Sequence, residues 1–129
     1  MLTDARVVAI VPTSDLARAR EFYEGTLELE DSGAPTPGPE VIYRCGNGSL
    51  LQVYETSSAG AAQHTLASWE VGDVKAAVDG LRSRGVRFED YDFPEFKTDD
   101  GIATAGDSQA AWFRDPDGNI LCLHSPIER

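Results

Sequence analysis

Hydrophobic and polar residues near the start of the chain follow first the pattern of a strand and then that of a helix. The run ARVVAIV (5–11) is apolar and rich in β-branched residues, which predicts a buried strand. The capping residues TSD (13–15) come next, followed by LARAREFY (16–23), in which apolar residues recur at helical spacing. The pattern therefore predicts a strand and then a helix that ends near Gly25.

Beyond this helix, the first half is predicted to contain a loop and a hairpin. The segment DSGAPTPGPE (31–40) is rich in Gly and Pro, which break regular structure, so we expect a surface loop. VIYRC (41–45) and SLLQVYE (49–55) have the composition of strands. Gly46-Asn47-Gly48 lies between them and tolerates the positive φ angles of a hairpin turn.

The second half repeats this order of elements. We expect a strand, a capped helix, extended chain, a long polar loop and a closing hairpin. The sequence DPDG (115–118) supplies the turn of that hairpin, where Asp115 and Asp117 are expected to bond to the local backbone. The segments are TLASWEV (65–71), a helix from Val74 to near Gly85, VRFEDYDF (86–93), the polar loop up to Ser108, AAWFR (110–114) and NILCLH (119–124).

The repeat is also visible in the residue positions. Asp73 follows Asp15 by 58 positions, and the same offset pairs the apolar residues of the two helices. Gly118 follows Gly48 by 70 positions, so the second copy carries an insertion of 12 residues. Each βαβββ copy is too small to bury its sheet alone, so the two must pair. The expected boundaries are 1–129 for a single α+β domain, about 5–56 for module one and about 64–125 for module two.

Composition and charge narrow the range of partners. A chain of 129 residues with 41% hydrophobic and 26% charged residues has the composition of one folded domain. It contains neither a membrane-spanning run nor the features of a signal peptide, so we expect a cytoplasmic protein with its two cysteines reduced. The net charge of −11 would repel nucleic acids and anionic membranes, and it would attract a cationic ligand.

The chain resembles the vicinal oxygen chelate superfamily, which includes glyoxalases, bleomycin resistance proteins and extradiol dioxygenases. The resemblance covers nearly the whole chain. It rests on VAIVPTSDLARAREFYEGTL (8–27), WEVGDVKAAVDGLRSRGVRF (69–88) and, most specifically, WFRDPDGNILCL (112–123). One departure is Glu28, because the family often has Gly in this segment. The resemblance implies that the paired modules form a cupped mixed sheet, with the helices on the outer face and the ligand inside.

Metal-dependent members of this family hold a divalent ion with His, Gln or Glu side chains on four strands of the cup. The resemblance and the repeat offsets place these four positions at Val8, Gln52, Leu66 and Cys122. Val8 and Leu66 have no donor atom, and burial in an apolar cup opposes ionisation of a thiol. We therefore expect that the chain holds no metal and no other cofactor at this site.

A rebuilt metal site is the alternative. Side chains two residues apart on a strand share a face, so His124 accompanies Cys122, and His64 accompanies Leu66. Cys122, His124, His64 and Gln52 could then bind zinc.

Strand alternation also predicts which side chains face into the cup. Polar groups mixed with apolar walls are typical of a small-molecule pocket, whereas the opposite face is uniformly apolar and suits packing against the helices. One of Trp112 and Phe113 must face the cup. The predicted pocket residues are Val8, Ile10, Leu50, Gln52, Tyr54, Leu66, Ser68, Ile120, Cys122 and His124. The predicted helix-facing residues are Val7, Ala9, Val11, Leu51, Val53, Ala67, Trp69, Leu121 and Leu123.

From these features we expect a metal-free protein that binds a small organic molecule, and that is a homodimer. One alternative is a glyoxalase-like lyase, isomerase or dioxygenase with a rebuilt metal site, and another is an interaction module whose cup is filled by its own side chains. The loop at 91–108 is long for a structureless connection and carries Phe93, Phe96 and Ile102. We expect it to fold over the mouth of the cup or onto a second subunit.

Overall fold

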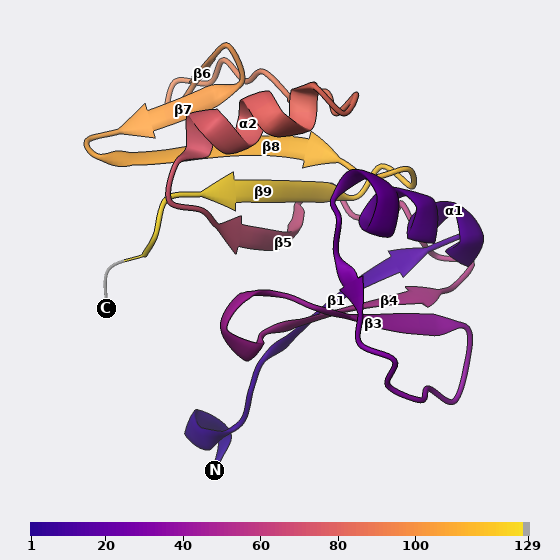
Figure 1. The fold of residues 1–129 in the computed structure, drawn as a ribbon. Helices are drawn as coiled ribbons and strands as arrows, with labels where there is room; N and C mark the ends of the chain where they lie inside the picture. Colours follow the sequence, from indigo (N-terminus) through magenta and orange to yellow (C-terminus); the bar gives the residue numbers. More distant parts are fainter. Residues whose placement is uncertain (128–129) are drawn as a thin grey trace.

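The computed structural model describes residues 1–127, and their elements follow one another as two consecutive modules (Figure 1). The predicted α+β class with two βαβββ modules is confirmed. The first half contains η1 (Leu2–Asp4), β1 (Val8–Thr13), α1 (Leu16–Arg20), η2 (Glu21–Thr26), β2 (Glu30–Asp31), β3 (Glu40–Arg44), η3 (Gly46–Gly48) and β4 (Leu50–Glu55). The second half contains β5 (Thr65–Glu70), α2 (Val74–Arg82), β6 (Thr98–Asp99), β7 (Ile102–Ala105), β8 (Ser108–Arg114) and β9 (Ile120–His124).

Each module starts its main helix at an aspartate. Asp15 Oδ1 accepts a hydrogen bond from the backbone N–H of Arg18 (3.1 Å), and Asp73 Oδ1 accepts one from Ala76 (3.0 Å). These caps satisfy backbone donors that the first helical turn leaves unpaired. The two caps lie at equivalent places of the sequence repeat, which explains why the same turn recurs. α1 continues into the π-helical segment η2, which ends at Thr26, one residue past the predicted end.

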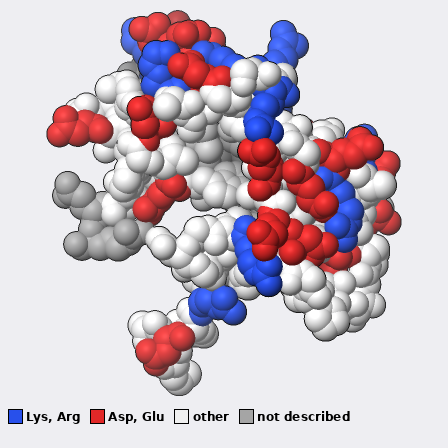
Figure 2. Space-filling model, in the orientation of Figure 1, with Lys and Arg blue, Asp and Glu red and all other residues white. Residues whose placement is uncertain are grey.

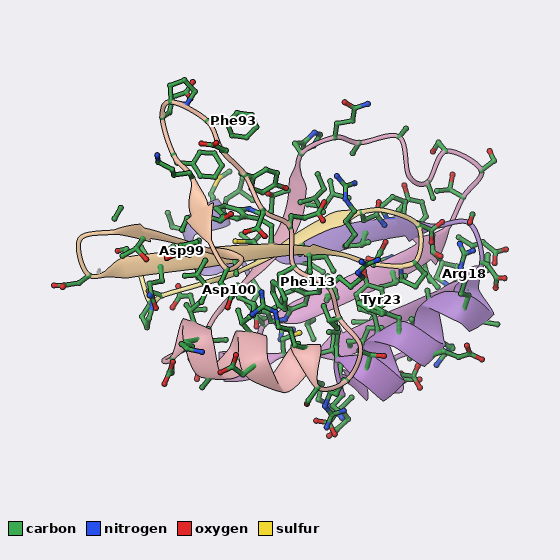
Figure 3. All side chains as sticks on the ribbon, turned by 90° about the horizontal axis from the view of Figure 1, so that it is seen from above. Arg18, Tyr23, Phe93, Asp99, Asp100 and Phe113 are labelled. Atoms are coloured by element: carbon green, nitrogen blue, oxygen red, sulfur yellow. The ribbon has the colours of Figure 1, made fainter. Side chains whose placement is uncertain are left out.

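The strands form two mixed sheets, in the orders β1-β4-β3-β2 and β5-β9-β8-β7-β6. In each sheet the first and last strands of the module pair in parallel, and the other neighbours are antiparallel. The sheets meet where β1 contacts β5. Figure 3 shows both helices on one side of the sheets, with the labelled Phe93 on the other side. We call these two sides the helix face and the cup face. Among residues 1–127, no helix is long and apolar enough to cross a membrane.

The hydrophobic core lies on the helix face, as strand alternation predicts. Tyr23, Tyr43 and Phe113 are its largest fully buried side chains. Eight of the nine predicted helix-facing residues are buried or pack against this core, and they are Ala9, Val11, Leu51, Val53, Ala67, Trp69, Leu121 and Leu123. The prediction for Val7 is wrong, because β1 begins only at Val8 and the Val7 side chain is 88% exposed.

The long polar loop of the second module contains strands that the sequence pattern did not predict. β7 pairs with β8, and the short β6 pairs with β7 at the outer edge of the sheet. The prediction of a loop up to Ser108 is therefore wrong for the residues of β6 and β7. Ile102 in β7 is the only large apolar residue of these two strands, so their sequence shows no strand-like alternation.

A polar network around the DPDG turn ties the second module to the first. Asp117 accepts hydrogen bonds from Thr13 Oγ1 (2.6 Å), Ser14 N (2.9 Å) and Ser14 Oγ (2.6 Å), and it pairs with Arg18 (3.2 Å). Buried Asp115 accepts a hydrogen bond from the Tyr23 hydroxyl (2.6 Å). The expected bonds to the local backbone are found for Asp115, which accepts from the N–H groups of Asp117 and Asn119. The prediction is wrong for Asp117, whose carboxylate is bonded to the first module instead.

Candidate functional site

The floor of the cup face in the second module brings three polar side chains together. Ser68 pairs with Cys122 in the register of β5 and β9, and His124 lies two residues further along β9 on the same face. The Ser68 hydroxyl is hydrogen-bonded to His124 Nδ1. Burial raises the pKa of the Cys122 thiol, and a hydrogen bond with Ser68 opposes this shift only in part. Cys122 is therefore a neutral side chain rather than a thiolate at neutral pH.

The first module contributes a more open surface. Ile10 lies beside Gln52 in the register of β1 and β4, and it is 51% exposed. Gln52 Nε2 donates a hydrogen bond to Glu40 Oε2 on β3 (3.0 Å). Tyr54 is 36% exposed, whereas Val8 and Leu50 are half-buried. This side of the cup face thus presents apolar surface with one amide–carboxylate pair.

The four positions that correspond to the family's metal ligands do not fit a metal ion. Val8 and Leu66 supply no donor, and burial raises the pKa of the Cys122 thiol, so the amide oxygen of Gln52 is the single ordinary donor among the four. In addition, the register of β5 and β9 shifts between Thr65 and Ala67, so Leu66 lies at an irregularity in the strand pairing.

The alternative zinc site is not assembled. No group of three or more His, Cys, Asp or Glu side chains within residues 1–127 is placed to hold a metal ion. Although Cys122 and His124 share a face, His64 lies before β5 on an exposed segment. The alternative grouping of Cys122, His124, His64 and Gln52 is therefore not found in this part of the chain.

Four aromatic side chains form a wall above the outer part of the cup face. Trp112 on β8 contacts Tyr91 at a ring-centroid distance of 5.6 Å and Phe96 at 5.5 Å. Phe93 stacks on Tyr91 (5.7 Å) and contacts Phe96 (5.5 Å). We call these four residues the aromatic wall. Trp112 thus faces the cup and Phe113 the core, in agreement with the prediction that one of the two faces inward.

A cavity of about 1070 Å³ opens beside the aromatic wall. Its apolar lining includes Phe93, Phe96 and Trp112 of the wall, and its polar lining includes His124 and Gln109. Of the ten predicted pocket residues, only His124 lines this cavity. The remaining lining residues are Pro94, Glu95, Lys97, Ala103, Thr104, Ala105, Asp107, Ser108, Ala110, Ser125, Pro126 and Ile127.

Most of this lining was not predicted, because it comes from residues 93–109 and 125–127 rather than from the strands of the sequence repeat. The signal available in the sequence was the presence of Phe93 and Phe96 in an otherwise polar loop. Both remain partly exposed, at 48% and 39%, although they contact other rings. Exposed aromatic side chains beside a cavity are typical of binding surfaces.

Comparison with solved structures supports the same architecture. A glyoxalase/bleomycin resistance protein from Catenulispora acidiphila is 25% identical, with a TM-score of 0.65 over 95% of this chain and 98% of that one. TnmS3, an antibiotic binding protein from a Streptomyces species, is 24% identical, with a TM-score of 0.68 over 98% and 99%. A lactoylglutathione lyase from Agrobacterium tumefaciens is 20% identical, with a TM-score of 0.63 over 95% and 93%.

In the comparison with curated proteins, no sequence matches this chain. The family model of the Glyoxalase/Bleomycin resistance protein/Dioxygenase superfamily, in contrast, matches residues 6–123. This match includes both modules and the DPDG turn between β8 and β9. The chain therefore belongs to the Glyoxalase/Bleomycin resistance protein/Dioxygenase superfamily.

Proposed function

We propose that this chain binds a small organic molecule on the cup face of its second module, without a metal ion held by the protein. The observation that carries the proposal is the cavity of about 1070 Å³ beside the aromatic wall. Small-molecule sites are concave, largely apolar and supplied with a few polar groups that orient the ligand. Here the rings of Phe93, Phe96 and Trp112 supply the apolar surface, while His124 and Gln109 supply the polar groups.

The charges around the cavity favour a neutral or cationic ligand. Among residues 1–127, the charged residues that line it are Glu95, Asp107 and Lys97, in a chain whose net charge is −11. The faces of Trp and Phe rings attract cations, and this attraction adds to the effect of the carboxylates. We therefore propose a flat, largely apolar ligand with a positive or neutral charge.

Binding without turnover is supported by the side chains of the cup. The positions of the family's metal ligands hold Val8 and Leu66, which cannot polarise a substrate oxygen. The fold is also that of TnmS3, which is an antibiotic binding protein, so ligand capture is compatible with this architecture. A homodimer and a cytoplasmic location remain predictions from the sequence.

Fluorescence of Trp112 provides a direct test. We expect that ethidium, a flat aromatic cation, quenches Trp112 in a Trp69→Phe variant, in which Trp112 is the only tryptophan. Phe96→Ala should weaken binding roughly three- to tenfold, because one aromatic contact is lost. Val7→Ala is the control, since Val7 is exposed and does not line the cavity. Unsaturable quenching, or equal affinity in the Phe96 and Val7 variants, would rule out the proposed site.

A further inference from the structure

Two cavities lie next to each other on the helix face, where α2 approaches the first module, and Arg84 lines both of them. The first has a volume of about 350 Å³, and most of its lining is apolar, including Leu27, Leu29, Trp69 and Leu81. Figure 2 views this face and shows an uncharged hollow between the modules, with charged side chains around it. We call the two cavities together the junction groove.

The second cavity, also of about 350 Å³, carries a concentration of positive charge. Three of the 11 Lys and Arg residues of the chain line it, namely Arg84, Arg87 and Arg114, with Glu89 as the only carboxylate. Arg114 is paired with Glu89 (2.7 Å). Arg87 is exposed and forms no ion pair with any residue in the range 1–127. In a chain with a net charge of −11, this cavity therefore offers a local cationic site with one unused guanidinium.

The ion pair between Arg84 and Glu28 lies at the boundary of the two cavities. Its Arg84 Nη2 to Glu28 Oε2 distance is 2.8 Å, and both side chains are partly exposed. Glu28 has a φ of 60°, in the left-handed region that non-glycine residues seldom adopt. Unfavourable backbone conformations of this kind concentrate at functional sites. Here the strained residue places its carboxylate against the arginine that lines both halves of the groove.

We propose that the junction groove binds an amphipathic carboxylate, whose apolar part lies against Trp69 and Leu81 and whose carboxylate pairs with Arg87. Arginine binds carboxylates through paired, charge-assisted hydrogen bonds. This site is separate from the proposed cup site, because it lies on the opposite face of the sheets.

Trp69 allows the groove to be observed separately from the cup. In a Trp112→Phe variant, Trp69 is the only tryptophan and it lines the apolar cavity. Bromine quenches an indole at close contact, so we would titrate this variant with a hexanoate carrying bromine at the end of its chain. The expected result is saturable quenching. The equivalent uncharged bromohexanol lacks the carboxylate, so its affinity should be lower by roughly tenfold or more.

Matched arginine variants test the charged half of the groove. Arg87→Gln should weaken binding of the bromohexanoate roughly tenfold, which corresponds to the loss of one charge-assisted hydrogen bond. Arg6→Gln makes the same change in charge on the exposed N-terminal segment, and it should leave the affinity unchanged. Equal affinities of the two variants, or equal binding of bromohexanol, would overturn the proposal. The proposal would also be overturned if Arg87→Gln changed the mass measured by sedimentation but left the affinity for bromohexanoate unaltered. That result would show that the groove forms contacts between copies of the chain.

Discussion

Asp117 holds the two modules together through a larger set of contacts than a turn residue needs. Burial alone would raise its pKa, but the hydrogen bonds from Ser14 and Thr13 and the charge of Arg18 outweigh burial. The pKa of Asp117 is therefore lowered from its ordinary value of 3.8. A carboxyl with a lowered pKa in the folded state stabilises the fold when it is ionised. The contribution is present above the unfolded pKa and is lost as the pH falls through the folded pKa.

We expect the free energy of unfolding to decline as the pH falls below about 4, and Asp117→Asn to remove part of this decline. At pH 7 the variant should be less stable by roughly 2 kcal/mol, because an amide cannot accept all the hydrogen bonds of the carboxylate. Urea unfolding monitored by circular dichroism at several pH values measures both effects. Asp107→Asn, on an exposed turn, is the control and should change neither. An Asp117 variant with unaltered stability at pH 7 would show that the inter-module contacts are energetically neutral.

The aromatic wall is an element with its own support rather than a free loop. Asp90 accepts hydrogen bonds from Thr98 Oγ1 (2.7 Å) and from the backbone N–H of Gly101 (2.8 Å), which closes the segment that carries Phe93 and Phe96. These hydrogen bonds lower the pKa of Asp90, so its carboxylate is ionised at neutral pH. The segment is therefore held in place as one side of the cavity before any ligand arrives.

Release of this segment should be visible by limited proteolysis. Asp90→Ala removes both hydrogen bonds, so trypsin should cleave faster after Lys97, while the midpoint of global unfolding changes little. Asp92→Ala makes the same change in charge two residues away, at an exposed carboxylate, and serves as the control. Cleavage at the same rate in the two variants would show that the rings alone hold the segment.

At this scale the sequence predicted the elements whose spacings repeat between the two modules, and it missed the short strands β6 and β7. The capping residues Asp15 and Asp73 and the two hairpin turns recur at fixed offsets in the sequence. The pattern in one module therefore supported the same assignment of elements in the other. β6 and β7 have no such counterpart pattern, and their pairing depends on β8, which lies outside their own sequence. The cavity depends on the same segment, which explains why His124 is the only one of the ten predicted pocket residues in its lining.

The whole molecule combines a closed core with an open cup face. The helix face buries the large side chains of both modules, whereas Ile10, Tyr54, Phe93 and Phe96 on the cup side remain substantially exposed. This asymmetry was inferable from the sequence, since strand alternation separated a uniformly apolar face from a mixed one. The position of the cavity over the second module could not be inferred from the sequence, because it results from contacts between residues distant in the chain.

The most direct test of the central claim is calorimetric titration of the wild-type protein with ethidium, in parallel with and without the chelator EDTA. We expect saturable binding near one equivalent in both titrations, with the same affinity and with no stoichiometric metal in the purified protein by elemental analysis. Binding that disappears in the chelator and returns when a divalent ion is added would contradict metal-free ligand capture on the cup face.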